Sequence, residues 1–298
     1  MLSVIIPTRN RNDLLTNCID AILRNSIKPE HIIVVDSSDS NKRINLEYMS
    51  TTIEHVFTEI KSAAKQRNLG LGKVPSKCDY VAFLDDDVIV PENYFSKLIV
   101  SMERYGYLGI SGKAINKENE FALKRKTSKT QLISRLFLLN STKNGVLLKS
   151  GVNIPVKSES AIPIEVEWLI GCSIWNFSKI NNCRFEEDFY GQSLGEDVVF
   201  SLKASRIGKI AVDPNVILNH LESPIMRPNS EEFMRMWITN RKRVINEMPS
   251  GPIKYLAYHW ANFGKLIQII VLPNPNKSLE LKGFLTGYKF VILGKHEN

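Results

Sequence analysis

The stretch Tyr80-Val81-Ala82-Phe83-Leu84-Asp85-Asp86-Asp87 decides the fold, because an apolar strand runs directly into three consecutive acids. Adjacent like charges repel, and they are costly near a core unless a cation offsets them. Carboxylate oxygens suit Mg²⁺ and Mn²⁺, and such sites usually keep positions open for substrate phosphates. The stretch therefore predicts a divalent-metal site for a phosphorylated ligand. A solvated turn, or an N-cap for a helix near Pro91-Glu92, is the alternative.

Composition is that of an ordinary globular protein with one large or two smaller domains. The 298 residues are 43% hydrophobic and 23% charged. The net charge of +8 favours anionic partners, which include nucleic acid, acidic lipids and phosphorylated substrates. The sequence contains no helix-turn-helix, zinc-finger or RNA-recognition motif, so we do not expect nucleic acid as a partner.

The four cysteines form no C-x-x-C pair. We expect reduced, partly buried thiols in a cytoplasmic protein, and no structural zinc site. The chain starts at once with a strand-like run, Leu2–Ile6, which favours the absence of a signal peptide.

The first half of the chain alternates strand and helix patterns, which is typical of a mostly parallel sheet covered on both faces. We expect strands at Leu2–Pro7, His31–Asp36, Thr52–Phe57 and Asp79–Leu84, and helices at about Asn12–Asn25 and Lys61–Leu69. Ligands bind at the carboxyl ends of the strands in such sheets. Three polar groups follow strands in this way and should converge on one crevice: Thr8-Arg9-Asn10, Asp36-Ser37-Ser38 and the acidic triplet.

The segment from about Lys113 to Lys157 is rich in lysine and arginine. Its basic residues include Lys117, Lys124, Arg125, Lys126 and Lys129. We interpret it either as a loop with part of an acceptor-side subdomain or as a solvated basic surface.

The next block runs from Glu165 to His220. Val166–Ser173 reads as a strand entering a glycine turn, and Gly195-Glu196-Asp197 opens a helix whose dipole favours acids in the first turn. Two short strands, Ile210–Val212 and Val216–Leu218, should then lead to His220.

The chain from Glu231 onward has a helical pattern. Leu256, Trp260, Phe263, Ile267 and Ile270 share one helix face. Polar residues interrupt Tyr255–Leu272, so it does not read as a membrane span. Two interpretations stay open: interfacial helices on an anionic bilayer, or a helical cap on the core.

Together these motifs resemble family 2 glycosyltransferases, which have the GT-A fold. The resemblance covers roughly Leu2 to His220 and rests on five segments in order: Val4–Arg11, Ile33–Ser38, Ala64–Gly70, Asp85–Asp87 and Gly195–Asp197. It implies an α/β GT-A domain with a Rossmann-like sheet and a C-terminal helical extension. We expect a nucleotide-sugar half at 1–112, an acceptor half at 113–228 and helices at 229–298.

The resemblance implies a nucleotide-diphosphate sugar donor, a divalent metal (Mn²⁺ or Mg²⁺) and inversion at the anomeric carbon. Donor-binding residues carried over from it are Pro7, Thr8, Arg9, Asp36, Arg67, Asn68, Asp85 and Asp86. Asp36 would accept a hydrogen bond from the base, and Asp87 with His220 would ligate the metal. Asp197 would be the catalytic base, with Glu196 beside it.

The resemblance also indicates acceptor-facing residues. These are Trp168, Gly171, Cys172 and Asp188. Core packing is the alternative for Trp168, a turn cap for Asp188, and a structural hydrogen bond for His220.

Departures from the family pattern limit the substrate class. The Gln-x-x-Arg-Trp motif of polymerising members is missing, which favours transfer of one sugar. We expect a UDP-sugar donor and a glycan or lipid-linked acceptor, on the cytoplasmic side or peripherally on the inner membrane face. The alternatives are a non-catalytic nucleotide-sugar-binding module and a sugar-phosphate nucleotidyltransferase. A nucleotidyltransferase would need a Gly-rich loop after the first strand, and the residues there, Pro7-Thr8-Arg9-Asn10, contain no glycine. No G-x-G-x-x-G follows any strand, which excludes a nicotinamide dehydrogenase.

Overall fold

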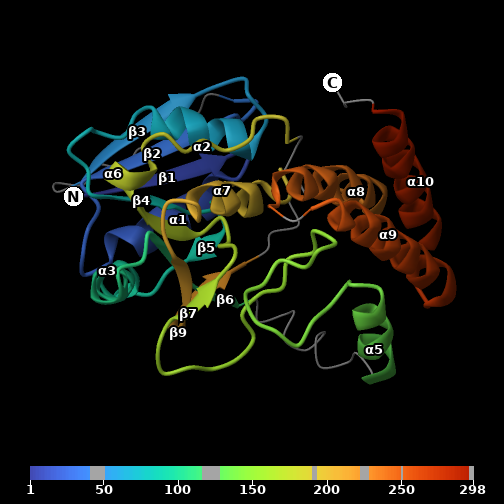
Figure 1. Cartoon of the computed structure of the whole chain (residues 1–298). Coiled ribbons are helices and arrows are strands. Elements are labelled where there is room, and N and C mark those ends of the chain that lie inside the picture. Colours follow the sequence, from blue (N-terminus) through green and yellow to red (C-terminus); the bar gives the residue numbers. More distant parts are fainter. Residues whose placement is uncertain (41–50, 116–127, 190–192, 222–227, 250, 295–298) are drawn as a thin grey trace.

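The computed structural model describes residues 1–40, 51–115, 128–189, 193–221, 228–249 and 251–294, with the side chains of 128–130 excepted. A nine-stranded sheet forms its centre, in the order β3-β2-β1-β4-β8-β6-β9-β5 with β7 beside β9 (Figure 1). The strands are β1 (Leu2–Thr8), β2 (His31–Asp36), β3 (Thr52–Phe57), β4 (Tyr80–Phe83), β5 (Val88–Ile89), β6 (Gly109–Ile115), β7 (Ile164–Val166), β8 (Ser173–Asn176) and β9 (Ile210–His220).

Helices cover the sheet and extend beyond it. They are α1 (Asn12–Leu23), α2 (Ala63–Leu71), α3 (Tyr94–Tyr105), α5 (Ser128–Leu136), α6 (Phe177–Ile180), α7 (Glu196–Ala204), α8 (Ser230–Glu247), α9 (Ile253–Val271) and α10 (Lys277–Leu293). Among the described residues, no helix combines the length and apolarity needed to cross a bilayer. The basic residues 117 and 124–126 that the sequence singled out lie outside the described residues.

The first four strands are parallel, as predicted, and their register brings the expected polar ends together. Thr8 pairs with Asp36, and Ile5 pairs with Phe83 on the other side of β1. Strands β1, β2 and β4 are buried on both faces, with alternate residues in two different cores, whereas the edge strand β3 is only half-buried. Ile5 and Phe83 pack under α2 and α7, whereas Val4 and Ala82 pack under α1 and α3.

The second half of the sheet is mixed. β8 runs antiparallel between β4 and β6. Glycine is required at position 109, because a Cβ there would lie 2.4 Å from the ring of Trp175 on β8. Two sequence predictions were wrong here. The expected strand Val166–Ser173 is a loop between β7 and β8, and the two short strands are one long strand, β9, with a register shift opposite Gly112/Lys113.

The three C-terminal helices pack against the domain through α8. Met234, Ile238, Ile245, Tyr258 and Phe284 join the same core cluster as the sheet. A capping box at Asn229 and Glu232 starts α8. Of the expected domain boundaries, 112 falls inside β6 and 228 falls just before α8; the division itself stays a prediction.

Candidate active site

One cavity of about 980 Å³ lies at the carboxyl ends of the parallel strands and under α8. Most of the residues singled out from the sequence line it. These are Pro7, Thr8, Arg9, Arg67, Asp85, Asp86, Asp87, Gly171, Glu196, Asp197 and His220. The ends of β1, β2 and β4 contribute Thr8, Ser37 and the acidic triplet to this one cavity, which is the convergence that the strand-end argument predicted.

Asp86 lies at the buried side of the acidic triplet and holds the loop in place. It accepts hydrogen bonds from Thr8 Oγ1 at 2.7 Å and from Arg11 Nη1 at 3.0 Å. Burial raises the pKa of Asp86 to about 6, and Arg11 opposes that rise. Arg11, which also lies 3.6 Å from Asp87, ties the end of β1 to the triplet.

Asp85, Asp87 and His220 form a candidate metal-binding group. Each offers one ligand atom, and these atoms lie within 4.8 Å of one another. The pairing of β5 with β9 sets Val88 opposite His220, which brings the imidazole 3.0 Å from Asp87 Oδ1. Two carboxylate oxygens and an imidazole nitrogen are ligands that could hold a divalent metal ion.

Arg67 of α2 joins the two acidic parts of the cavity. Its guanidinium donates to Asp85 Oδ1 at 2.6 Å and to Glu196 Oε1, and only 3% of the side chain is exposed. Burial works against its charge, but Glu196 and Asp85 hold the pKa of Arg67 above its usual value. Gly171 lies against this bridge, and a Cβ there would lie 2.9 Å from Arg67 Nη2.

Glu196 and Asp197 occupy the first turn of α7, but they differ in their partners. Gly195, with φ of +96°, provides the left-handed turn that starts the helix. Glu196 is buried and paired with Arg67, whereas Asp197 forms no ion pair among the described residues. The Asp197 carboxylate accepts the Val198 N–H at 2.8 Å.

Burial raises the pKa of both carboxyl groups in this turn. It raises the pKa of Asp197 to about 6, which the Val198 hydrogen bond and Arg67 oppose. Burial also raises the pKa of Glu196, against the charge of Arg67. Carboxyl groups tuned toward neutral pH in a cavity are typical of acid–base sites.

Five of the residues expected at the site do not line the cavity. Asp36 is buried, and its two oxygens accept from Ser38 N at 2.8 Å and pair with His55 Nε2 at 2.9 Å. Burial opposes its ionisation, but these hydrogen bonds hold the pKa of Asp36 below its usual value. Asn68 ties α2 to the backbone of Phe185.

The other three belong to the predicted acceptor side. The Trp168 indole is buried and donates to Ile154 O at 3.2 Å. Cys172 is buried with Sγ 3.7 Å from Asp85 Oδ2. Asp188 is exposed. Gly171 is thus the one predicted acceptor residue in the cavity wall.

Sequence reasoning missed two contributors. Gln66 donates to the carbonyls of Thr8 and Val35 and so fixes the ends of β1 and β2. Its position next to Arg67, inside the Ala64–Gly70 segment, could have indicated this role from the sequence. Arg241 of α8 lines the cavity beneath Gly151 and stacks 3.6 Å over the Trp237 ring. Burial lowers the pKa of Arg241 to about 9, and no sequence pattern indicates this burial.

Comparison with known proteins agrees with this geometry. Residues 3–164 match glycosyl transferase family 2. The match covers more than half of the chain, and the chain belongs to this family. The resemblance predicted from the sequence is therefore confirmed.

Two curated relatives are bacterial glycosyltransferases. The chain is 28% identical over 194 residues to the GalNAc(5)-diNAcBac-PP-undecaprenol beta-1,3-glucosyltransferase of Campylobacter jejuni, covering 64% of this chain and 56% of that protein. It is 29% identical over 101 residues to the O-antigen chain rhamnosyltransferase RfbN of Salmonella typhimurium. That match covers 33% of this chain and 32% of RfbN. The chain spans only about half the length of the first relative, and less of the second.

Solved structures of S. aureus TarS share the fold. The TarS 1–349 complex with UDP-GlcNAc aligns with a TM-score of 0.56 and 14% identity, over 96% of this chain and 81% of that one. A longer TarS structure aligns with a TM-score of 0.56 and 13% identity, over 96% of this chain and 49% of the TarS chain. At this identity the likeness concerns the fold alone, and it confirms the predicted α/β GT-A architecture.

Proposed function

We propose that this chain is an inverting glycosyltransferase that moves a single sugar from a nucleotide-diphosphate sugar, with a UDP-sugar favoured, to a hydroxyl of a glycan or lipid-linked glycan. Family membership supports the reaction class. One observation supports the other parts of the proposal: the candidate metal group lines the same cavity as Asp197, a carboxylate that forms no ion pair within the described part of the chain. Donor activation and acceptor deprotonation can then occur within one bound complex.

The donor would bind with its diphosphate at the acidic triplet. Asp85, Asp87 and His220 would hold Mn²⁺ or Mg²⁺, and the bound ion would supply Lewis-acid stabilisation of the departing diphosphate. Pro7, Thr8 and Arg9 would line the base pocket. A contact between Asp36 and the base would require one Asp36 oxygen to leave His55 or Ser38.

Asp197 would act as the general base. The acceptor oxygen forms a bond to the anomeric carbon while the bond from that carbon to the diphosphate oxygen breaks. Asp197 takes the hydroxyl proton, and the electron pair leaves on the nucleotide diphosphate. Such a base is worth roughly 10²–10⁴-fold in rate. No second carboxylate nucleophile is needed, unlike in a retaining glycosidase.

Glu196 would position this turn rather than take the proton. Its carboxylate pairs with Arg67, which also holds Asp85 on the donor side. To take a proton from the acceptor, the Glu196 carboxylate would have to leave Arg67, which would break that link. Asp197 has no ion-pair partner among the residues that the structure describes, which supports Asp197 rather than Glu196 as the base.

The acceptor class rests on the named relatives. One carries an undecaprenol-linked acceptor in its name, and the other an O-antigen chain. A lipid-linked or polymeric glycan of the cell envelope is the corresponding proposal here, with Gly171 and the 151–153 loop facing it. This proposal retains the expected site of action on the cytoplasmic side of the membrane.

A screen of nucleotide sugars with Mn²⁺ tests the proposal. Binding to the native state raises the melting temperature, and slow donor hydrolysis releases the nucleotide diphosphate. We expect a UDP-sugar to give both effects, and Asp197→Asn to retain the stabilisation but lose transfer. Binding without any turnover in the wild type would instead support a non-catalytic module. Wild-type transfer by Asp197→Asn would remove Asp197 as base.

A further inference from the structure

Helix α9 turns one row of large apolar side chains outward, while Tyr258 and Ile269 point into the core. Leu256, Trp260, Phe263 and Ile270 recur at helical spacing and are 73%, 44%, 52% and 50% exposed. Besides Tyr258 and Ile269, the buried side of the same helix carries small or polar residues, namely Ala257, Ala261, Gly264, Asn262 and Lys254. A helix on a water-facing surface normally buries its large apolar side chains. The outward face of α9 is therefore arranged for contact with an apolar phase.

Helix α5 and the turn after it continue this face. The Trp260 indole donates to Leu136 O at 2.8 Å, and Gln268 donates to Ser134 Oγ at 3.1 Å. The Phe137 ring lies 4.9 Å from the Trp260 ring. Glycine is needed at 264, because a Cβ there would lie 2.2 Å from Phe137.

On α5 itself, the outward side chains are apolar as well. Leu132, Ile133 and Leu136 are 68%, 48% and 65% exposed. We call this combined area the α5–α9 surface, defined by Leu132, Ile133, Leu136, Leu256, Trp260, Phe263, Ile270 and Val271. Contiguous exposed apolar patches of this kind mark interaction sites.

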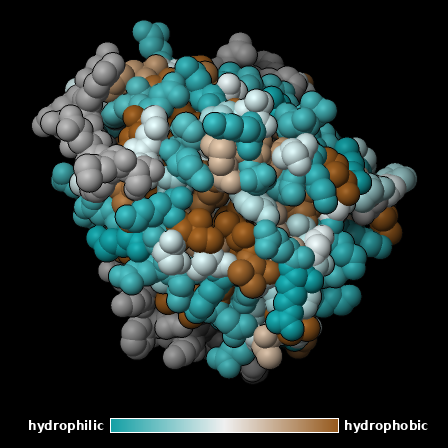
Figure 2. All heavy atoms as spheres, turned by 90° about the vertical axis from the view of Figure 1, so that its left-hand side faces the viewer, coloured by the Kyte–Doolittle hydropathy of each residue, from teal (hydrophilic) through white to brown (hydrophobic). Residues whose placement is uncertain are grey.

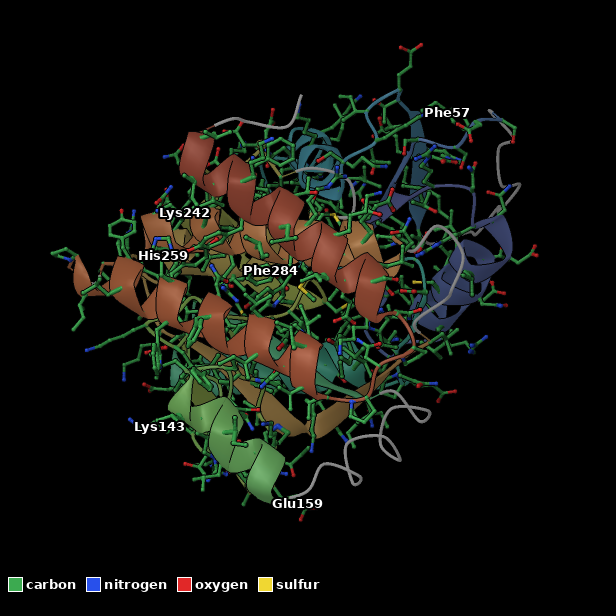
Figure 3. All side chains as sticks on the ribbon, turned by 90° about the vertical axis from the view of Figure 1, so that its right-hand side faces the viewer. Phe57, Lys143, Glu159, Lys242, His259 and Phe284 are labelled. Carbon is green, nitrogen blue, oxygen red and sulfur yellow. The ribbon has the colours of Figure 1, made fainter. Side chains whose placement is uncertain are left out.

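The charge around the α5–α9 surface is mostly positive, although Glu159 lies beside α5 (Figure 3) and Glu280 of α10 lies 3.8 Å from Lys265 of α9. Residues 128–158 and 248–279 contain eight lysines and arginines and no aspartate or glutamate, although the whole chain has 31 acids. Arg135, Lys143, Lys149 and Lys277 are exposed. Figure 3 shows α5 beneath α9, with Lys143 beside α5 and His259 on α9. The opposite side of the molecule is mostly hydrophilic, with a small apolar cluster near its middle (Figure 2).

We propose that the α5–α9 surface docks on an anionic lipid bilayer, with its apolar side chains at the headgroup–acyl boundary and its basic rim against acidic headgroups. Apolar insertion combined with a basic polar rim is the pattern of interfacial helices, and Trp260 and Tyr255 have the amphipathic rings that favour this depth. A protein partner would need acidic groups around an apolar centre. A second copy of this basic chain lacks that complementarity, because the two rims would repel.

The docked surface lies next to the cavity. Ser150 Oγ donates to Leu138 O at 2.6 Å, just after α5, and Gly151 lines the cavity. A glycan attached to a membrane lipid would reach the active site past this loop. That use of the surface rests on the proposed function, whereas the binding to lipid does not.

Vesicle co-sedimentation of the full chain tests the proposal without donor or acceptor. Vesicles of phosphatidylcholine with about one third phosphatidylglycerol are compared with pure phosphatidylcholine. We expect the wild type to pellet with the anionic vesicles and more weakly with neutral ones. Leu256→Ser/Phe263→Ser should weaken binding by about tenfold or more. Arg135→Gln/Lys143→Gln should weaken binding to the anionic vesicles alone.

A matched control uses exposed apolar residues elsewhere. Val100→Ser/Ile207→Ser alters side chains that are 60% and 52% exposed, and it should bind like the wild type. Wild-type protein that stays in the supernatant with both vesicles would overturn the proposal. A second outcome would also overturn the proposal. If the wild type sediments as a dimer and Leu256→Ser/Phe263→Ser sediments as a monomer, then a second copy of the chain covers the α5–α9 surface. UDP-sugar stabilisation of the same variants reports separately on the proposed function.

Discussion

Replacing Asp197 by asparagine should stabilise the protein while it removes the proposed transfer. Burial raises the pKa of Asp197 from 3.8 to about 6. The native state therefore binds this proton more tightly than the unfolded state does. Stability is then lost as the pH rises between about 4 and about 6, and it stays lowered above that range.

The magnitude follows from the pKa difference. At about 1.4 kcal/mol for each pKa unit, ionising Asp197 costs at most about 3 kcal/mol at pH 7.5. Glu196 titrates in the same turn and shares part of this cost, so we expect a gain of about 1–3 kcal/mol for Asp197→Asn. The amide oxygen can still accept the Val198 N–H, so the helix start is kept.

Urea denaturation in EDTA at pH 4.0 and pH 7.5 measures this effect. The variant and the wild type should be nearly equal at pH 4.0, and the variant should be more stable at pH 7.5. Asp188→Asn is the control, because that carboxylate is exposed, and its effect should stay within about 0.5 kcal/mol. An Asp197→Asn protein that is no more stable than the wild type at pH 7.5 would refute the reasoning.

Three further predictions concern the bridge, the metal and the sheet. Arg67→Met should lower the free energy of unfolding by about 3–5 kcal/mol, because Asp85 and Glu196 lose their shared cation. Urea denaturation measures this loss, with the exposed Arg206→Met as the control. A loss no larger than that of the control would contradict a buried ion-pair bridge. Mn²⁺ should tighten UDP binding in calorimetry, and EDTA or His220→Ala should abolish the gain; equal affinities with and without metal would count against the site. Gly109→Ala should cost about 1–3 kcal/mol through the clash with Trp175, whereas Gly251→Ala, whose Cβ meets nothing within 4 Å, should keep the wild-type melting temperature.

Local patterns were enough to predict the donor half of the fold. The strands His31–Asp36 and Thr52–Phe57 have the predicted bounds, and α1 begins at the predicted Asn12. The hydrophobic periodicity and the terminal residues of each of these elements are enough to predict it. Parallel strands also place their carboxyl ends at one edge of the sheet. The acidic triplet and Thr8 could therefore be brought together from sequence alone.

Antiparallel additions to the sheet were harder to predict. β9 contains Asp213 and Pro214, which break the apolar pattern, yet pairing with β6 and β7 keeps it one strand through a register shift. Pairing partners distant in the chain decide whether such a stretch is extended, and no local window contains them.

What the sequence by itself determined is the four parallel strands of the first half, the start of α1 and the acids that follow β4, because these depend on neighbours within a few residues. Only the tertiary structure decided how those side chains are used. It turned Asp36 toward His55, joined Arg67 to Glu196 across 129 residues of chain, and left the apolar face of α9 outward. The reason is that ion pairing and burial depend on which side chains meet after folding, and residues far apart in the chain meet only when the whole sheet has assembled.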